Sequence, residues 1–304
     1  MIRCTMNKPK VSVSLITYNQ ENCVRATIES ILQQDYENVE IVISDDASTD
    51  QTPNIIAEYY ELYPSKIIFL KNLQRGGVTI NSQRALEKCS GDFVTFIGGD
   101  DLYLPGKLSA QVKWFFEHSD AVACYHDIIL FDRDKKKIID RYYSTICGMA
   151  NKVLFYRCFA AAQSIMLKRS AIPLNGYNKT IPNCSDWFLV VDALIKSRGY
   201  IGYVDGVYAY YVKHQDNITK KNKKLYLEIV SAYKQYKLNY PKYLKQFDLC
   251  LAEEAIAGIK NSLKNKDLKS MWYCLYELLH TSSIFKALFN IIARTNKKIK
   301  KNIF

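Results

Sequence analysis

The 304-residue sequence has no run of about 20 consecutive apolar residues, which is the length that a membrane-spanning helix needs. It also has no internal repeat, no low-complexity tract and no cysteine pair at CxxC spacing, so we expect neither a repeat array nor a zinc site. Its first residues lack the apolar segment of roughly 7–15 residues that a signal peptide carries. We therefore expect the nine cysteines to be reduced thiols of a cytoplasmic protein.

Charge is distributed unevenly along the chain. Residues 1–150 contain 16 Lys and Arg against 20 Asp and Glu, a net charge of −4. Residues 151–304 contain 26 against 10, a net charge of +16. A cationic C-terminal half predicts an anionic partner, for which phospholipid headgroups, a phosphorylated acceptor and nucleic acid are the candidates. A genomic bias toward Lys, Ile, Asn and Tyr is the alternative explanation for part of this excess.

The first hundred residues alternate between strand and helix patterns. We expect strands at 11–16, 39–43, 66–70 and 92–97, and helices at 21–33, 50–62 and 78–88. Alternation at this interval predicts βαβ units, a parallel sheet and a doubly wound α/β fold. Because parallel strands end at the same edge of a sheet, the polar segments that follow three of these strands should line one cleft. These segments are 17–20, 45–50 and 98–101.

The pattern beyond residue 105 is less regular. Helices are expected at 105–117 and 186–197, the second one capped by Ser185, and strands at 121–131, 138–143, 164–168 and 200–212. From about Lys220 the chain becomes basic and helical, with helices expected at 225–238, 244–263, 270–280 and 284–293. The sequence therefore predicts an α/β domain over residues 1–215 and a basic helical region over residues 216–304.

Two adjacent carboxylates follow the fourth predicted strand. Gly98 and Gly99 end this strand at a tight turn, and Asp100 and Asp101 come directly after them. Because two neighbouring carboxylates repel each other, a cation should share their site. Oxygen ligands select a hard ion such as Mg²⁺ or Mn²⁺, which also binds phosphate oxygens. The pair thus predicts a metal–diphosphate site, and the alternative is a solvated turn, since short motifs often match by chance.

Four motifs occur in a fixed order, and together they resemble the family 2 glycosyltransferases, which are inverting enzymes of the GT-A fold that build bacterial surface polysaccharides. The motifs are Lys10–Asn19, Ile41–Asp50, Gly91–Leu108 and Ser185–Trp187, within a resemblance that covers about residues 9–215. It implies a mixed, mainly parallel sheet flanked by helices. It also implies transfer of a sugar from a nucleotide-diphospho-sugar, with UDP expected, to a hydroxyl of a glycan or a polyprenyl-linked oligosaccharide.

The resemblance implies roles for the residues of the nucleotide site. Thr17, Tyr18 and Asn19 belong to the nucleotide loop, in which the Tyr18 ring offers a stacking face to the base. Asp46 would accept a hydrogen bond from a base N–H group, as on uracil. Asp100 would hydrogen-bond the ribose.

The resemblance further implies a divalent metal, Mn²⁺ or Mg²⁺, and a general base. Asp101 would ligate the metal, and His214 would help to bind the metal or the diphosphate, although a lone histidine is as often structural. Asp186 would be the base, because inversion by a single displacement requires the acceptor hydroxyl to lose its proton as it attacks. A capping role is the alternative for Asp186. The neighbouring Trp187 either supports an acceptor sugar or packs beside the base.

The sequence departs from the family pattern at two places. Ser185 stands where relatives have Glu, so any acceptor contact from that Glu is lost or replaced. The segment 76–91 lacks the Ala-Arg-Asn run that is common in relatives, and Arg84 is the nearby cation.

The C-terminal region carries no motif. The apolar segment 284–293 precedes residues 294–301, of which five of eight are Lys or Arg. This arrangement suits a helix at an anionic membrane surface, hence peripheral attachment at the inner face of the cytoplasmic membrane, and equally a packed helical subdomain with a solvated tail.

Two other functions compete with the glycosyltransferase reading. A nucleotidyltransferase is disfavoured because no Gly-rich loop with Lys or Arg follows the first strand. A non-catalytic membrane-binding or nucleic-acid-binding module is disfavoured because it would not need the acidic residues, which repel a polyanion; we expect no nucleic-acid partner.

Overall fold

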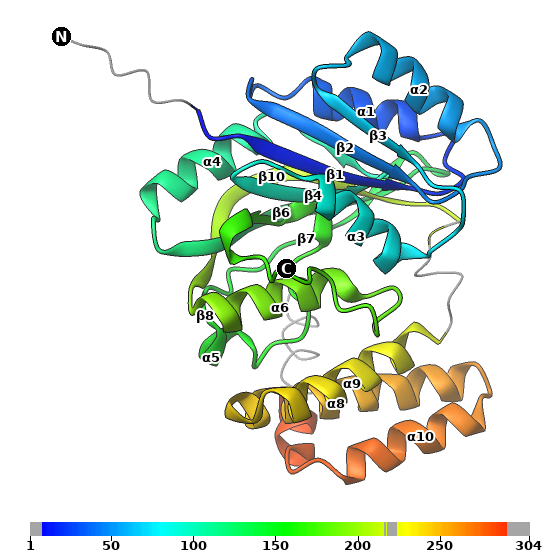
Figure 1. The fold of residues 1–304 in the computed structure, drawn as a ribbon. Helices are drawn as coiled ribbons and strands as arrows, with labels where there is room; N and C mark the ends of the chain where they lie inside the picture. The colour runs from blue at the N-terminus through cyan, green and yellow to red at the C-terminus, as the bar shows by residue number, and fades with distance from the viewer. Residues whose placement is uncertain (1–7, 216, 218–223, 291–304) are drawn as a thin grey trace. The chain divides into compact units, whose positions relative to one another are not determined.

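A computed structural model describes residues 8–215, 217 and 224–290. The chain divides into two compact units, of which the first comprises Met1–Ala150 and Cys158–Asn217 and the second Asn151–Arg157 and Ile218–Phe304 (Figure 1). The predicted division into domains of residues 1–215 and 216–304 stays a prediction. None of the helices in the described ranges is long and apolar enough to cross a bilayer.

The first unit is built on one mixed sheet, which has ten strands within the described residues. The strands follow the order β3-β2-β1-β4-β9-β6-β10-β5, with β7 beside β6 and β8 beside β10. Parallel pairs join β1, β2, β3 and β4, and also β6 and β10, so that the prediction of a mixed, mainly parallel sheet is confirmed. The strands are β1 (Val11–Thr17), β2 (Val39–Asp45), β3 (Ile67–Lys71), β4 (Phe93–Gly98), β5 (Leu102–Tyr103), β6 (Ala121–Asp132), β7 (Lys137–Tyr142), β8 (Gly148–Met149), β9 (Met166–Lys168) and β10 (Tyr200–Lys213).

Helices cover both faces of this sheet. Helices α1, α2 and α4 pack on one face, and α3 and α6 lie on the other (Figure 1). The helices up to residue 197 are α1 (Val24–Leu32), α2 (Thr52–Leu62), α3 (Val78–Lys88), α4 (Lys107–Glu117), the short α5 (Ala150–Val153) and α6 (Ser185–Ser197).

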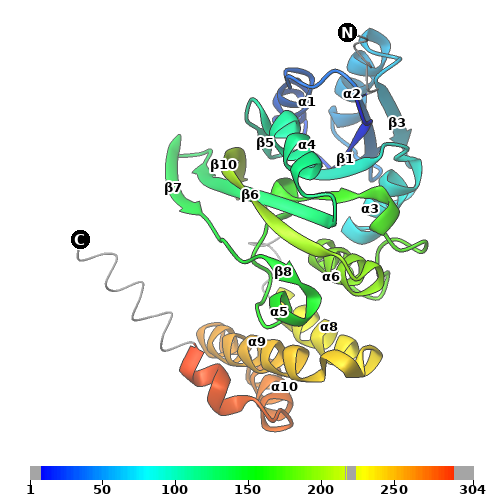
Figure 2. The ribbon, with the colours of Figure 1, turned by 90° about the vertical axis from the view of Figure 1, so that its left-hand side faces the viewer.

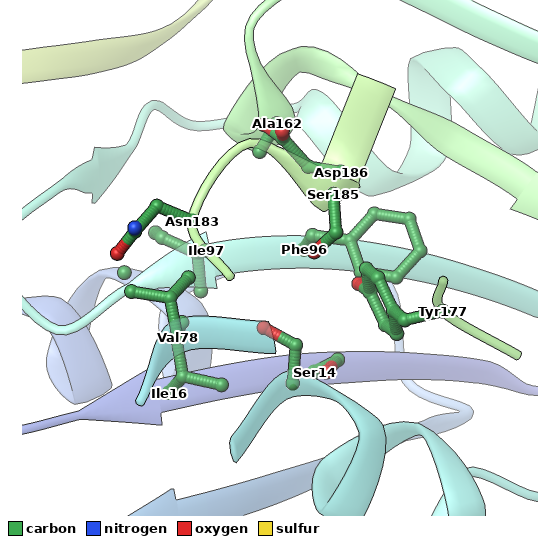
Figure 3. Close-up of a pocket in the computed structure, with 12 residues that line it drawn as sticks. Ser14, Ile16, Val78, Phe96, Ile97, Ala162, Tyr177, Asn183, Ser185 and Asp186 are labelled. Atoms are coloured by element: carbon green, nitrogen blue, oxygen red, sulfur yellow. The ribbon is translucent and has the colours of Figure 1, made fainter. Parts of the chain in front are cut away.

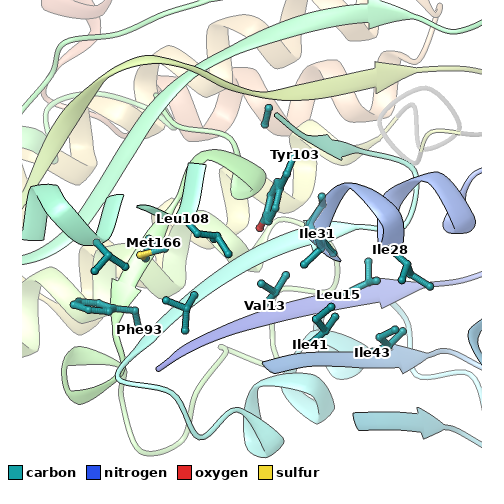
Figure 4. Packing of buried hydrophobic residues seen from close by; sticks show 14 of the residues in the cluster. Val13, Leu15, Ile28, Ile31, Ile41, Ile43, Phe93, Tyr103, Leu108 and Met166 are labelled. Atoms are coloured by element: carbon teal, nitrogen blue, oxygen red, sulfur yellow. The ribbon is translucent and has the colours of Figure 1, made fainter. Parts of the chain in front are cut away.

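The main apolar core fills the space under α1, α2 and α4. In β1 the side chains alternate between the two faces, so that Val13 and Leu15 point into this core while Ser12 and Ser14 point to the opposite face. Figure 4 shows Val13 and Leu15 beside Ile28 of α1 and the neighbouring β2 side chains. Each fully buried aliphatic side chain of this kind stabilises the fold by roughly 1.5–3 kcal/mol relative to exposure. The alternation seen in the sequence thus sets which face of the strand is apolar.

The parallel register gathers the ends of three strands. β1 lies between β2 and β4, and Ile16 pairs with both Ser44 and Gly98. The segments that follow these strands therefore begin at one edge of the sheet, as predicted.

One charged side chain lies inside the core of this unit. Lys107, at the start of α4, is fully buried, and its Nζ donates to Thr95 Oγ1 and Gln111 Oε1, both at 2.7 Å. The ammonium group also lies 4.3 Å from the centroid of the Tyr103 ring. Burial lowers the pKa of Lys107 to about 7, because an ammonium ion is poorly solvated there.

The described part of the second unit contains three long helices, and α9 packs against both of the others (Figure 2). They are α8 (Leu225–Asn239), α9 (Leu244–Lys264) and α10 (Leu268–Leu279). Buried carboxylates of this unit are paired with basic residues, as in Glu277 with Lys234 at 2.6 Å and Glu253 with Arg157 at 3.3 Å. Of the predicted last segment, residues 284–290 are helical, and its remainder and the basic run 294–301 lie outside the described residues.

Candidate active site

The two loops after β1 and β2 are tied to each other by side-chain hydrogen bonds. Thr17 Oγ1 donates to Asp45 Oδ1 at 2.9 Å. The Asn19 backbone N–H donates to Ser48 Oγ at 2.8 Å, and Asn19 Oδ1 accepts from the Thr49 N–H at 2.9 Å. Thr17 and Asn19 therefore fix the wall of the predicted nucleotide site, and direct contact of either with a nucleotide stays a prediction.

Asp46 anchors the turn that leads into α3. Its side chain is nearly buried, and its two oxygens accept from the backbone N–H groups of Gly76 at 2.7 Å and Gly77 at 2.8 Å. Gly77 has φ +80°, which favours glycine. Arg84 Nη1 lies 3.4 Å from Asp46 Oδ1. Since an ionised carboxylate has about four acceptor positions, Asp46 retains capacity for the predicted base N–H.

Arg75 adds a cation that sequence reasoning missed. Its guanidinium carbon lies 4.0 Å from the centroid of the Tyr18 ring, a distance typical of cation–π stacking. The turn held by Asp46 brings Arg75 to Tyr18, and this long-range contact leaves no local signal in the sequence. The two flat groups form a stack beside the Asp46 carboxylate.

Asp100 and His214 face each other across the end of the sheet. Asp100 Oδ2 lies 2.8 Å from His214 Nε2 and accepts from Asn217 Nδ2 at 3.2 Å. Asn217 also accepts the His214 backbone N–H at 2.7 Å, so this asparagine positions both groups. A Cβ atom on Gly98 would lie 2.8 Å from Asp100 Oδ1, which explains the glycine before the pair. Sequence reasoning singled out His214 and missed Asn217.

Asp101 makes contacts within the fold, and its predicted metal role stays a prediction. Its side chain is buried, Oδ1 accepts the Val212 N–H of β10 at 2.8 Å, and its backbone oxygen accepts from Thr27 Oγ1 of α1 at 2.8 Å. Burial, together with the neighbouring charge of Asp100, raises the pKa of the Asp101 carboxyl well above its usual range. The sequence assigned the metal to Asp101 and the ribose to Asp100, yet it is Asp100 that faces His214.

The chemistry of this pair fits a divalent ion. Among the described residues, no three His, Cys, Asp or Glu side chains converge into a complete metal site. An ion that accompanies a nucleotide commonly takes one or two protein carboxylates and completes its shell with phosphate oxygens and water. Asp100 Oδ2 and His214 Nε2 supply one hard oxygen and one imidazole nitrogen at adjacent positions, a donor set that suits Mn²⁺.

Arg133 lies beside the end of β10. Its backbone N–H donates to the carbonyl of Lys213, the residue before His214, at 3.0 Å. The positive charge of Arg133 and the negative charge of Asp100 both act on the Cys23 thiol. Burial and the Asp100 charge raise the pKa of Cys23 to about 11, and Arg133 acts in the opposite direction. In the sequence, Arg133 is only one member of a charged turn.

Asp186 lies in the first turn of α6 and lines a pocket of about 100 Å³ (Figure 3). Ile16 of β1, Val78 of α3 and Gly98 of β4 line the same pocket. Asp186 and the segment that carries Asp100 therefore border the same end of β4. Asp186 is thus placed near the end of β4 that precedes Asp100, and its catalytic role stays a prediction.

The start of α6 is held in place by α3. Thr79 Oγ1 donates to the Ile181 carbonyl at 2.5 Å and lies 2.6 Å from Ser185 Oγ. The expected capping of α6 by Ser185 is wrong, because the helix begins at Ser185 itself and Cys184 occupies the cap position, where its side chain makes no capping hydrogen bond. The hydroxyl of Ser185 serves to dock the helix, which orients Asp186.

Trp187 packs in the interior. Its side chain is 3% exposed, and its ring meets the Phe159 ring edge-on at a centroid distance of 4.8 Å. Of the two alternatives for Trp187, the packing role is the one that the structure supports.

The fold and the acidic sheet edge are those of a nucleotide-sugar transferase, and a family model supports this class. The model for "Glycosyl transferase family 2" matches residues 12–171. The chain therefore belongs to glycosyl transferase family 2, as its motifs indicated.

Two relatives illustrate this similarity. An uncharacterized protein of Mycobacterium tuberculosis is 30% identical over 217 residues, which cover 68% of this chain and 60% of that protein. The UDP-Glc:alpha-D-GlcNAc-diphosphoundecaprenol beta-1,3-glucosyltransferase WfaP of Escherichia coli is 30% identical over 162 residues, covering 53% of this chain and 62% of WfaP. The chain thus spans about 60% of the length of these curated relatives.

A solved structure shares the fold. The crystal structure of S. aureus TarS 1–349 in complex with UDP-GlcNAc superposes with a TM-score of 0.56 at 17% identity, covering 86% of this chain and 89% of that one. This likeness confirms the predicted GT-A architecture.

Proposed function

We propose that this chain transfers a sugar from a nucleoside-diphospho-sugar, with UDP as the nucleotide, to a hydroxyl of a glycan or a polyprenyl-linked oligosaccharide, with inversion at the anomeric carbon. One observation carries the proposal. Asp186 lines a pocket with Gly98, and Asp100, two positions after Gly98, faces His214. A base for the acceptor and a site for the leaving diphosphate therefore border the same end of β4.

The nucleoside would bind at the loops after β1 and β2. The Tyr18–Arg75 stack would hold the base by its flat face, and Asp46 would accept its N–H group. The TarS complex with UDP-GlcNAc and the name of WfaP support a UDP-sugar donor, and WfaP also supports an acceptor linked through diphosphate to undecaprenol.

Asp100 and His214 would hold a divalent ion, Mn²⁺ or Mg²⁺. When bound, such an ion neutralises charge on the diphosphate and makes it a better leaving group. Asn217 would keep the two protein groups oriented, since it hydrogen-bonds both Asp100 and the His214 backbone. Arg133 would add a fixed positive charge near Cys23, on which the Asp100 charge also acts, and this charge would stabilise the departing diphosphate.

Asp186 would accept the proton of the acceptor hydroxyl. The acceptor oxygen forms a bond to the anomeric carbon while the bond from that carbon to the diphosphate oxygen breaks, and the proton moves to the Asp186 carboxylate. The contacts of Ser185 with Thr79 would hold the base in position during this step. The proposed site of action is the inner face of the cytoplasmic membrane.

The purified chain should release UDP from a UDP-sugar when an acceptor is present, and Mn²⁺ should increase the rate. NMR of the product would show a glycosidic bond of the anomeric configuration opposite to that of the donor. Release of pyrophosphate from a nucleoside triphosphate would favour a nucleotidyltransferase. Absence of turnover with a full panel of nucleotide sugars and acceptors would favour a binding module.

A further inference from the structure

Helix α10 carries large apolar side chains on its exposed face. Its inner face is buried, as Cys274 and Leu278 show. The outer face of a surface helix is normally polar. Here four large side chains, spaced by four, four and three residues, form one stripe on that face. They are Leu268, Trp272, Tyr276 and Leu279, which are 64%, 63%, 56% and 66% exposed.

The helical segment 284–290 adds two aromatic side chains. Ala287 is fully buried in the core of this unit, and Ile284 packs against the same core. Phe285 and Phe289, in contrast, are 85% and 71% exposed. We name these two residues together with Leu268, Trp272, Tyr276 and Leu279 the α10 surface.

The segments that carry and flank the α10 surface are rich in exposed lysines. The acidic residues of this unit largely pair with basic residues of the same unit, including Asp248 with Lys237 and Asp267 with Lys224. Exposed lysines lie near the α10 surface in the sequence, at the end of α9, in the turn before α10, at its start and in the segment 284–290. They are Lys260, Lys264, Lys266, Lys269 and Lys286.

We infer that the α10 surface docks the protein on an anionic lipid bilayer. Trp and Tyr prefer the boundary between headgroups and acyl chains, where Leu and Phe side chains enter the apolar layer. Lysines around such a patch are attracted by anionic headgroups. This inference goes beyond the proposed transferase activity and does not depend on it.

The charges argue against other occupants. A symmetric dimer through the α10 surface would bring the same lysines of two copies together, which is unfavourable because a two-fold interface pairs a patch with itself. A nucleic acid would satisfy the lysines and leave the Leu and Phe side chains in water. An anionic bilayer satisfies both groups at once.

The test compares vesicle binding by the full chain and two double variants. Trp272→Gln with Leu279→Gln removes apolar contacts and keeps helix propensity, because glutamine is a good helix former. Leu62→Gln with Phe116→Gln is the matched control, since these residues lie on α2 and α4 and are 70% and 62% exposed. Co-sedimentation uses vesicles of equal parts phosphatidylglycerol and phosphatidylcholine, and vesicles of phosphatidylcholine alone.

We expect the wild-type chain and the control to bind the anionic vesicles, and the α10 variant to bind about tenfold more weakly or worse. Binding to phosphatidylcholine alone should be weak, and salt should weaken binding to the anionic vesicles. Melting temperatures should agree among the three proteins, because the substituted side chains are exposed.

Equal vesicle binding by the α10 variant and the wild type would overturn the inference. It would also fall if the wild type formed a dimer in light scattering that the α10 variant did not form, with no vesicle binding by either. UDP release with a water-soluble acceptor should be the same in all three proteins, so a failure of the proposed activity is distinguishable from a failure of this inference.

Discussion

His214 Nε2 lies 2.8 Å from Asp100 Oδ2, although the two residues are 114 positions apart in the chain. His214 directly follows β10 and lies beside the turn after β4. Asn217 accepts the His214 backbone N–H and donates to Asp100, so it hydrogen-bonds both residues. Asp101, the immediate neighbour of Asp100, is buried against Val212. The two adjacent carboxylates therefore have different surroundings.

Replacement of Asp100 by Asn, or of His214 by Ala, should weaken UDP binding in the presence of Mn²⁺ by about tenfold or more, because a metal donor is lost. Titration calorimetry with and without Mn²⁺ measures this difference. Asp101→Ala should instead lower the melting temperature, since it removes the buried acceptor of the Val212 N–H. Loss of Mn²⁺-dependent binding in Asp101→Ala, at an unchanged melting temperature, would favour Asp101 as a metal ligand.

Asp186→Asn should reduce kcat by about 10²–10⁴-fold, which is the usual contribution of a general base. The affinity for the UDP-sugar should stay near that of the wild type, because the base acts only as the acceptor attacks. Steady-state kinetics and donor titration separate the two effects. Wild-type turnover by this variant would place the base at another residue.

Arg75→Ala should weaken UDP binding by several-fold, because Arg75 holds the Tyr18 ring, on which the base would stack, through a cation–π contact of about 0.5–2 kcal/mol. The change should not depend on Mn²⁺, because Arg75 stacks on Tyr18 and not on the Asp100–His214 pair. Arg25→Ala is the matched control, as Arg25 also lies over a tyrosine ring, that of Tyr59, at 5.4 Å. If both variants lose affinity equally, the Tyr18–Arg75 stack is not the base site.

Arg133→Gln should reduce kcat more than it weakens donor binding, because the charge it supplies matters most when the diphosphate departs. Lys135→Gln provides the control from the same turn, since the Lys135 side chain is exposed and lies 3.9 Å from Asp132. The comparison needs kcat and KM of both variants at saturating Mn²⁺. If both variants lowered kcat by the same small factor, the effect would come from the net charge of the turn and not from Arg133 in particular.

The buried Lys107 should make stability depend on pH. Its pKa falls to about 7 in the folded state from 10.5, so the unfolded chain binds more protons between these values. The free energy of unfolding should therefore rise from pH 7 toward pH 10.5, with a contribution on the order of a few kcal/mol.

Lys107→Met should lack this contribution. The informative quantity is the difference in the free energy of unfolding between wild type and variant, because other buried groups also titrate. His126 has a lowered pKa and Cys124 a raised one, both mainly through burial; the Lys107 charge also lowers both pKa values, so each should rise slightly in the variant. A difference that does not change with pH would mean that Lys107 keeps its proton in the fold.

Periodicity in the sequence predicted most of the fold. The strands and helices up to β4 lie within a few residues of their expected positions, because each spans enough residues to show its period. The two-residue strands β5 and β8 were missed, since two residues contain no period. The sheet edge could be predicted because it follows from parallel topology.

The contacts of the site were less predictable. Arg75, Arg133 and Asn217 reach their places through turns and through strand β10, and no local pattern marks such residues. Asp100 and Asp101 could not be told apart in the sequence, because the direction of each side chain depends on the turn that carries them. The sequence predicted Ser185 as a helix cap. In the structure its hydroxyl instead contacts the hydroxyl of Thr79 in α3, a contact between residues distant in the sequence.

The first turn of α3 holds two parts of the site together. The Gly76–Gly77 turn precedes this first turn and donates two backbone N–H hydrogen bonds to Asp46. Thr79 lies within the first turn and hydrogen-bonds the Ile181 carbonyl, shortly before α6. If nucleotide binding displaced the Gly76–Gly77 turn, the displacement would reach Thr79 and, through its hydrogen bonds, the start of α6 that carries Asp186. The proposed donor site and the proposed base, Asp186, are thereby connected through the short backbone segment between Gly76 and Thr79.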